Sequence, residues 1–223
     1  MSLRGKIVRV LHPVLKPISR VYLRKERSWS YGDLKFKVLP GIFHPGLFFS
    51  TKILMDMLSE MALKGKTFLE LGCGSGAISV LAASKGAFVT ASDIDPKAIE
   101  NTAFNASKNR VEIETVKSDL LDSISKEFDV IIINPPYYPK DPSRPEEAAF
   151  YCGTDHVYFK RLFQQLAERT TSDPQVFMIL SEDCRIDRIR EIALEDGLVL
   201  SLHLEHRVLG ENNFVFRIEN RTE

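Results

Sequence analysis

The sequence has few cysteines and no long apolar run. Its three cysteines, Cys73, Cys152 and Cys184, are odd in number and far apart. That spacing argues against a disulfide framework and against a metal site built on a C-x-x-C pair. No apolar stretch approaches the roughly 20 residues of a membrane-spanning helix, and the basic N-terminus lacks the apolar core and cleavage site of a signal peptide. The sequence therefore predicts a cytoplasmic protein with reduced thiols and no membrane association.

Net charge is also lacking, although the charges are unevenly distributed. The 30 lysine and arginine residues balance the 30 aspartate and glutamate residues. Residues 1–37 nevertheless hold ten basic and two acidic residues, so this segment carries eight surplus positive charges. Such a segment is suited to contact with RNA, a ribosome or a lipid surface. The alternative is a solvated segment that packs back on the domain.

Before residue 67 the sequence predicts helices and no strand. Within residues 1–30 an apolar pattern with helical spacing is interrupted by Pro13 and Pro17, which predicts one or two short helices. A further helix is predicted over 53–61, with Ser50 or Thr51 as its N-terminal cap.

From residue 67 the chain alternates between short apolar segments and longer amphipathic ones. Strands separated by helices predict a mostly parallel sheet with helices on both faces. The short link between the last two strands suits an antiparallel hairpin, so one reversed strand is expected at the end of the sheet. The predicted strands are 67–71, 87–92, 111–116, 128–134, 175–181, 198–206 and 213–219. Helices are predicted from 76 to 85, from Pro96 onward with Asp95 as cap, from 157 to 170 and from 185 to 196.

The first of these strands is followed by a turn rich in glycine. Gly72, Gly74 and Gly76 let the backbone approach a ligand closely, but the spacing is neither G-x-G-x-x-G nor that of a phosphate-binding P-loop. Glu70 stands just before them, where an anion would suit a cationic ligand. Asp93 ends the second strand and Asp119 follows the third. Open α/β sheets bind ligands at these strand ends, so the three acids together with the glycines predict a binding site.

The fourth strand runs into Asn134-Pro135-Pro136-Tyr137. Asparagine and proline are common turn formers, so alone this segment would be interpreted as a turn that ends a strand. Its position after a glycine turn and two aligned acids favours a functional role.

The segment from Glu70 to Gly76, together with Asp93, Asp119 and Asn134-Pro135-Pro136-Tyr137, resembles the class I S-adenosylmethionine-dependent methyltransferases. It is most similar to the NPPY-motif N-methyltransferase branch, which includes the release-factor glutamine N5-methyltransferases and related small-domain methyltransferases. The resemblance implies an α/β fold with a Rossmann-like, seven-stranded, mostly parallel sheet whose last strand is antiparallel, and helices on both faces. We divide the chain into a basic N-terminal extension at 1–45 and a methyltransferase domain at 46–223.

The same resemblance implies S-adenosylmethionine as the cofactor. No metal is expected, because the spacing of His44, His156, His203 and His206 relative to Cys and Asp is not that of metal ligands. Asp93 would hold the ribose, Ile94 would pack on the adenine, and Asp119 would accept the adenine amino group. The implied cofactor-binding residues are Glu70, Gly72, Cys73, Gly74, Gly76, Asp93, Ile94, Asp119, Leu120 and Asn134. The implied catalytic residues are Asn134, Pro135, Pro136 and Tyr137.

The motif has a chemical rationale. A planar nitrogen in an amide or a nucleobase is a poor nucleophile because its lone pair is delocalised. The Asn134 side-chain oxygen and the Pro135 carbonyl can accept hydrogen bonds from both N–H groups, which orients the nitrogen and stabilises its growing positive charge. Prolines stiffen the turn and remove competing donors, and Tyr137 offers a ring for stacking on a flat group.

Three interpretations of function follow. The first is methyl transfer to a planar nitrogen of a protein of the translation machinery, either a side-chain amide or an amine. It is favoured because residues 146–160 resemble the region after the motif in the glutamine branch. The second is an RNA adenine or guanine N-methyltransferase, favoured by the basic N-terminus and by Tyr137 and Tyr138. The third is a non-catalytic cofactor-binding scaffold. The expected partner is thus a protein or an RNA.

Overall fold

A computed structural model describes residues 25–143, 147, 149–169 and 174–221 of the 223-residue chain. The short helices predicted at the N-terminus fall mostly outside these residues. Among the described residues, no helix is long and apolar enough to cross a membrane.

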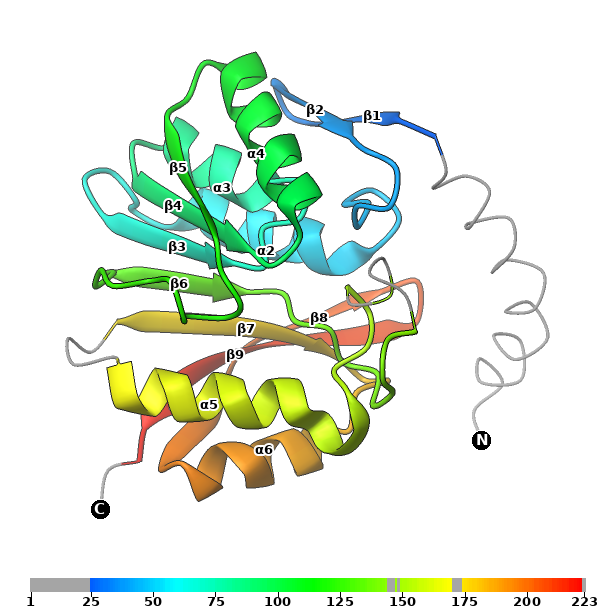
Figure 1. Cartoon of the computed structure of the whole chain (residues 1–223), viewed down its shortest axis with the longest axis vertical. Helices are drawn as coiled ribbons and strands as arrows, with labels where there is room; N and C mark the ends of the chain where they lie inside the picture. The colour runs from blue at the N-terminus through cyan, green and yellow to red at the C-terminus, as the bar shows by residue number, and fades with distance from the viewer. Residues whose placement is uncertain (1–24, 144–146, 148, 170–173, 222–223) are drawn as a thin grey trace.

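A sheet of seven strands forms the centre of the molecule (Figure 1). In chain order the strands are β3 (Thr67–Leu71), β4 (Phe88–Asp93), β5 (Ile113–Lys117), β6 (Val130–Ile133), β7 (Gln175–Ser181), β8 (Leu198–Val208) and β9 (Glu211–Asn220). Their order across the sheet is β5-β4-β3-β6-β7-β9-β8. The chain thus starts in the middle of the sheet, moves to one side, and returns to build the other side.

All neighbouring pairs from β5 through β7 are parallel, while β9 runs antiparallel to both β7 and β8. The prediction of a mostly parallel sheet with a reversed last strand is confirmed. The reversed strand does not lie at the edge, however. The hairpin folds back so that β9 inserts between β7 and β8, because Phe216 and Ile218 of β9 join the buried core beside β7 whereas much of β8 is solvent-exposed.

Helices cover both faces of the sheet, as predicted. On one face lie α2 (Phe49–Glu60) and α3 (Ala77–Ser84), and on the other α5 (Val157–Arg169) and α6 (Ile186–Glu195). Strand β6 shows why both faces are apolar: Val130 and Ile132 join the core under α2 and α3, and Ile131 and Ile133 join the core under α5 and α6. A strand buried on both faces reads as a continuous apolar run because its side chains alternate between the two cores.

The sequence did not predict the two-stranded hairpin of β1 (Arg27–Tyr31) and β2 (Leu34–Val38). It packs on α4 (Pro96–Asn109), whose N-terminal cap is Asp95 as expected: the carboxylate accepts from the Lys97 N–H at 2.9 Å. Three asparagines spaced four residues apart on α4 bind the outer edge of β2. Asn109, Asn105 and Asn101 accept from the backbone N–H groups of residues 35, 37 and 39 at 2.8–2.9 Å, and their amide nitrogens donate back to backbone carbonyls of β2. We call these side chains the asparagine ladder.

The ladder explains why a short hairpin is stable here. Each carboxamide offers the same donor and acceptor pair as a backbone peptide group, so α4 takes the place of a third strand. Asn101 and Asn105 are fully buried. The boundary predicted between residues 45 and 46 stays a prediction.

Candidate functional site

A cavity of about 490 Å³ opens at the carboxyl ends of the parallel strands. It is the place where the chain order reverses, between β3 and β6, and such switch points bind ligands in open α/β sheets. With one exception, the residues predicted for the site line this cavity. They are Glu70, Gly72, Cys73, Gly74, Asp93, Ile94, Asp119, Leu120, Asn134, Pro135, Pro136 and Tyr137. What each does toward a ligand stays a prediction.

The exception is Gly76, which does not contribute to the described cavity lining. It forms the N-cap of α3 with φ of 72°, and a Cβ there would lie 2.7 Å from Thr102 of α4. Glycine is needed because two helices and a turn meet at this point. The structure thus gives Gly76 a packing role, and the expectation that it contacts a cofactor stays a prediction.

Gly72 and Gly74 face open space instead. Their φ angles are 80° and 52°, a region that L side chains rarely adopt, and an added Cβ at Gly72 would meet nothing within 4 Å. The Gly72 N–H and the Cys73 N–H both donate to the Ser92 carbonyl at 2.9 Å, which ties the turn to β4. The two glycines thus leave a backbone surface that a ligand can approach.

Asp93 links the end of β4 to the glycine turn. One carboxylate oxygen accepts from the Gly74 N–H and the other from the Asp95 N–H, each at 2.9 Å. Burial raises the pKa of Asp93, although these backbone donors oppose the shift. A carboxylate has about four lone-pair sites, so Asp93 retains acceptor capacity for a ligand hydroxyl. Ile94, the next residue, is 54% exposed at the cavity rim.

Glu70 is buried beneath the glycine turn. Its carboxylate accepts from the Ser79 N–H at 2.7 Å and from the Ser79 hydroxyl, at the start of α3. Burial, with a smaller contribution from the charge of Asp93, raises the pKa of Glu70 to about 8. These hydrogen bonds anchor the start of α3, and the suitability of Glu70 for a cationic ligand stays a prediction.

Asn134 lies directly after β6 at the cavity wall. Its amide nitrogen donates to the Thr51 hydroxyl at 3.4 Å, and in the described part of the chain no side chain or backbone group donates to its oxygen. The sequence suggested Ser50 or Thr51 as the N-terminal cap of α2. That prediction is wrong, because α2 starts at Phe49 and has no side-chain cap. Thr51 instead orients the carboxamide with its acceptor available to the cavity.

The two prolines and Tyr137 form the wall beyond Asn134. Pro135 is buried, and the Tyr137 ring packs against the core under α5 and 4.8 Å from the ring of Tyr138. Burial raises the pKa of Tyr137 well above its ordinary value, so the ring stays neutral. Stacking of this ring on a substrate stays a prediction.

Two sets of lining residues were not predicted as site residues. Tyr158 in the first turn of α5 faces both Asp93 and Asp119, whose charges add to the effect of burial and raise its pKa. Phe43 and Phe150 line the cavity from separate loops, and their rings pack together with Phe48 at 4.3–5.8 Å. The sequence contains these aromatics, but no spacing brings residues 43 and 150 together; only folding does.

The fold and the cavity define a class: an α/β protein with a ligand site at the switch point of a Rossmann-like sheet. The sequence pattern of the methyltransferase small domain family matches residues 33–147, more than half of the chain. The protein therefore belongs to the methyltransferase small domain family.

Individual relatives share about half of the chain. A ribosomal protein L11 methyltransferase of Thermosipho melanesiensis is 37% identical over 119 residues, which cover 52% of this chain and 46% of that protein. A release factor glutamine methyltransferase of Lactococcus lactis is 32% identical over 165 residues, covering 68% and 60% of the two chains. The chain thus spans about half the length of several curated relatives that it matches.

Among solved structures, the T. thermophilus 16S rRNA N2 methyltransferase in complex with AdoMet and guanosine superposes with a TM-score of 0.65. The match has 20% identity and covers 88% of this chain and 51% of that one. At this identity the similarity establishes the fold.

Proposed function

We propose that this protein transfers a methyl group from S-adenosylmethionine to a planar nitrogen, a side-chain amide or amine, of a protein of the translation machinery. The observation that carries the proposal is the orientation of Asn134: its nitrogen is held by Thr51 and its oxygen is available to the cavity. A carboxamide presented in this way accepts a hydrogen bond from an incoming N–H group.

The residues present fit the cofactor. Gly72 provides an open backbone surface, Asp93 retains acceptor sites for ribose hydroxyls, and Asp119 lies on the same cavity wall for the adenine. When bound, the cofactor supplies a methyl group on a positively charged sulfur, which becomes a neutral thioether after the transfer.

The protein would contribute position and electrostatics. The Asn134 oxygen and the Pro135 carbonyl would accept the two N–H groups of the acceptor and direct its lone pair. They would also stabilise the positive charge that grows on nitrogen. No strong base is required, because the methylated, positively charged nitrogen is acidic and loses its proton to water.

The translation machinery is proposed as the source of the substrate because the relatives include a ribosomal protein L11 methyltransferase and a release factor glutamine methyltransferase. The second candidate is RNA, because the same fold occurs in an rRNA methyltransferase in complex with guanosine. The third candidate is a scaffold that binds the cofactor without turnover. Such a protein would transfer no methyl group to protein or RNA.

The experiment is transfer of a tritiated methyl group by purified protein into extracts of cells that lack the gene, followed by separation of protein from RNA. Label in a protein of the translation machinery supports the proposal, and label in RNA supports the second candidate. Asn134→Ala should lower the rate by about 10²–10³. Its affinity for S-adenosylhomocysteine should stay close to that of the wild type, and near-normal turnover would contradict the role given to Asn134.

A further inference from the structure

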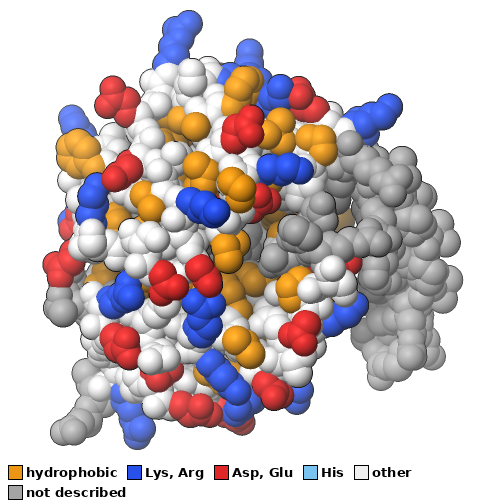
Figure 2. Space-filling model, in the orientation of Figure 1, with side chains coloured by type: hydrophobic (Ala, Val, Ile, Leu, Met, Phe, Trp, Pro, Cys, Tyr) orange, Lys and Arg blue, Asp and Glu red, His pale blue; other side chains and the backbone are white. Residues whose placement is uncertain are grey.

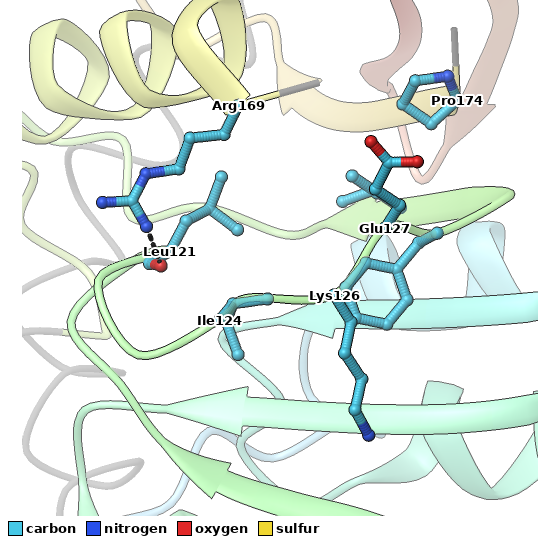
Figure 3. A pocket seen from close by; sticks show the side chains of 8 residues that line it. Leu121, Ile124, Lys126, Glu127, Arg169 and Pro174 are labelled. Carbon is cyan, nitrogen blue, oxygen red and sulfur yellow. Dashed lines mark hydrogen bonds between the residues drawn. The ribbon is translucent and has the colours of Figure 1, made fainter. Parts of the chain in front are cut away.

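The loop after β5 carries Asp119 and Leu120, and α5 holds it in place. Leu121 is the clearest case. Its N–H donates to the Gln165 side-chain oxygen at 2.8 Å, and its carbonyl accepts from the Arg169 guanidinium. Figure 3 shows the Arg169 side chain extending from the end of α5 to this carbonyl. Both backbone groups of Leu121 are thus bound by side chains of one helix.

The contacts continue along the same face of α5. Arg161 donates to a carboxylate oxygen of Asp119 at 2.8 Å and lies 3.4 Å from Asp122, while the Gln165 amide donates to Asp122 at 2.7 Å. Arg161, Gln165 and Arg169 are spaced four residues apart, so they form one row on the helix. Tyr158, three residues before Arg161, starts the row and lines the cavity.

The loop needs such support because of its backbone. Leu120 has φ of 50°, a left-handed conformation that is unfavourable for a leucine. Local bonds favour it, since Ser118 donates to the Leu120 carbonyl at 2.8 Å and accepts from the Ser123 N–H at 3.0 Å. Without the contacts from α5, Asp119 would be free to change its direction.

We propose that Arg161 and Gln165 are positioning residues that make the site selective for a 6-aminopurine. Arg161 binds one oxygen of Asp119, which lines the cavity, so the other carboxylate oxygen is left as an acceptor. Gln165 fixes the loop on which Asp119 stands. The inference rests on the proposed function, because it takes the adenine of the cofactor as the group that Asp119 accepts.

A purely structural role for Arg161 predicts a different result. Arg161 and Asp119 each retain 42% side-chain exposure, so solvent screens the pair and its contribution to stability is small. Arg161→Met should fold normally, since no core residue changes. A positioning role for Arg161 is therefore tested by the ligand selectivity of Arg161→Met and not by its stability.

The test is calorimetric affinity for S-adenosylhomocysteine and for its analogue whose purine lacks the 6-amino group. The wild type should prefer the 6-amino compound about tenfold, the value of one charge-assisted hydrogen bond. In Arg161→Met this preference should fall to about twofold or less while the affinity for the analogue is unchanged. Gln165→Met should also lose part of the preference, and Lys160→Met, an exposed change on the same helix, should keep it.

Two results would overturn the inference. If Arg161→Met and Gln165→Met retain the full preference, or lose affinity equally for both compounds, the row on α5 has only a structural role. A wild type that binds neither compound would overturn the proposed function as well, so the two failures are distinguishable.

Discussion

At the scale of single residues, the direction in which Asn134 presents its carboxamide depends on Thr51, which lies 83 positions earlier in the chain. Thr51 is almost completely buried. Glu70 and Asp93 show a second residue-scale effect: burial raises the pKa of each, and hydrogen bonds from backbone N–H groups oppose the shift. Local surroundings thus set the chemistry of side chains whose type the sequence already gives.

Thr51→Val should lower kcat about fivefold to tenfold, because the isosteric change removes one hydrogen bond that orients Asn134. The affinity for S-adenosylhomocysteine should change little. Thr51→Ser, which keeps the hydroxyl, is the matched control and should retain most of the activity. Steady-state kinetics on the identified substrate would measure the effect, and an unchanged kcat in Thr51→Val would show that the carboxamide is oriented without Thr51.

Glu70 should make stability depend on pH. Its pKa is about 8 in the folded protein against an ordinary value of 4.5, so the folded state holds a proton that the unfolded state has lost. The stabilisation by protonated Glu70 is complete below pH 4.5 and declines as pH rises toward 8. Urea unfolding at several pH values should show the wild type losing stability relative to Glu70→Gln across this window. Parallel pH profiles of the two proteins would contradict the raised pKa.

At the scale of elements, polar side chains of two helices, α4 and α5, bind the backbone of neighbouring segments. The asparagine ladder of α4 completes the edge of β2, and the row on α5 holds the loop after β5. Both helices present polar side chains, spaced four residues apart, toward backbone N–H and carbonyl groups. Asn105 also donates to the Ser75 carbonyl at 2.8 Å, so the ladder joins the hairpin to the glycine turn.

Asn105→Leu should destabilise the protein by about 3 kcal/mol, because it removes the partner of the partly buried Lys37 N–H and of the buried Ser75 carbonyl. Asn109→Leu is the matched control. Its ladder contacts are exposed, so water can replace them and the loss should stay below about 1 kcal/mol. Denaturant unfolding would measure both, and equal losses would mean that the ladder does not act through burial.

At the scale of the whole molecule, three distant segments build one cavity: the loop before α2, the glycine turn with its acids, and the segment after β6. On the face of the molecule seen in Figure 2, charges of both signs are interspersed. The surplus of positive charge in residues 1–37 is the main asymmetry in the sequence. Within the described part, Lys37 pairs with Glu26 at 2.7 Å and lies over the Phe104 ring.

Neutralising Arg20, Arg24, Lys25 and Arg27 tests whether this asymmetry serves an RNA or ribosomal substrate. Binding to phosphates releases counterions, so the Michaelis constant should rise steeply with salt in the wild type and less steeply in the variant. Neutralising Lys64, Lys108, Lys117 and Lys160, four exposed residues elsewhere, is the control. An unchanged salt response after removal of the N-terminal charges would show that the segment serves the fold alone.

The sequence by itself determined the order of strands and helices from residue 67 onward, the parallel sheet and the edge where the cavity lies. It could do so because apolar periodicity, short links and residues such as Gly72, Pro96 and Asn134 act through local geometry. Only the tertiary structure decided the insertion of β9, the packing role of Gly76, the raised pKa of Glu70 and the contacts of Thr51 and Arg161. Each of these depends on burial or on partners distant in the sequence, and local patterns carry no information about which distant residues meet.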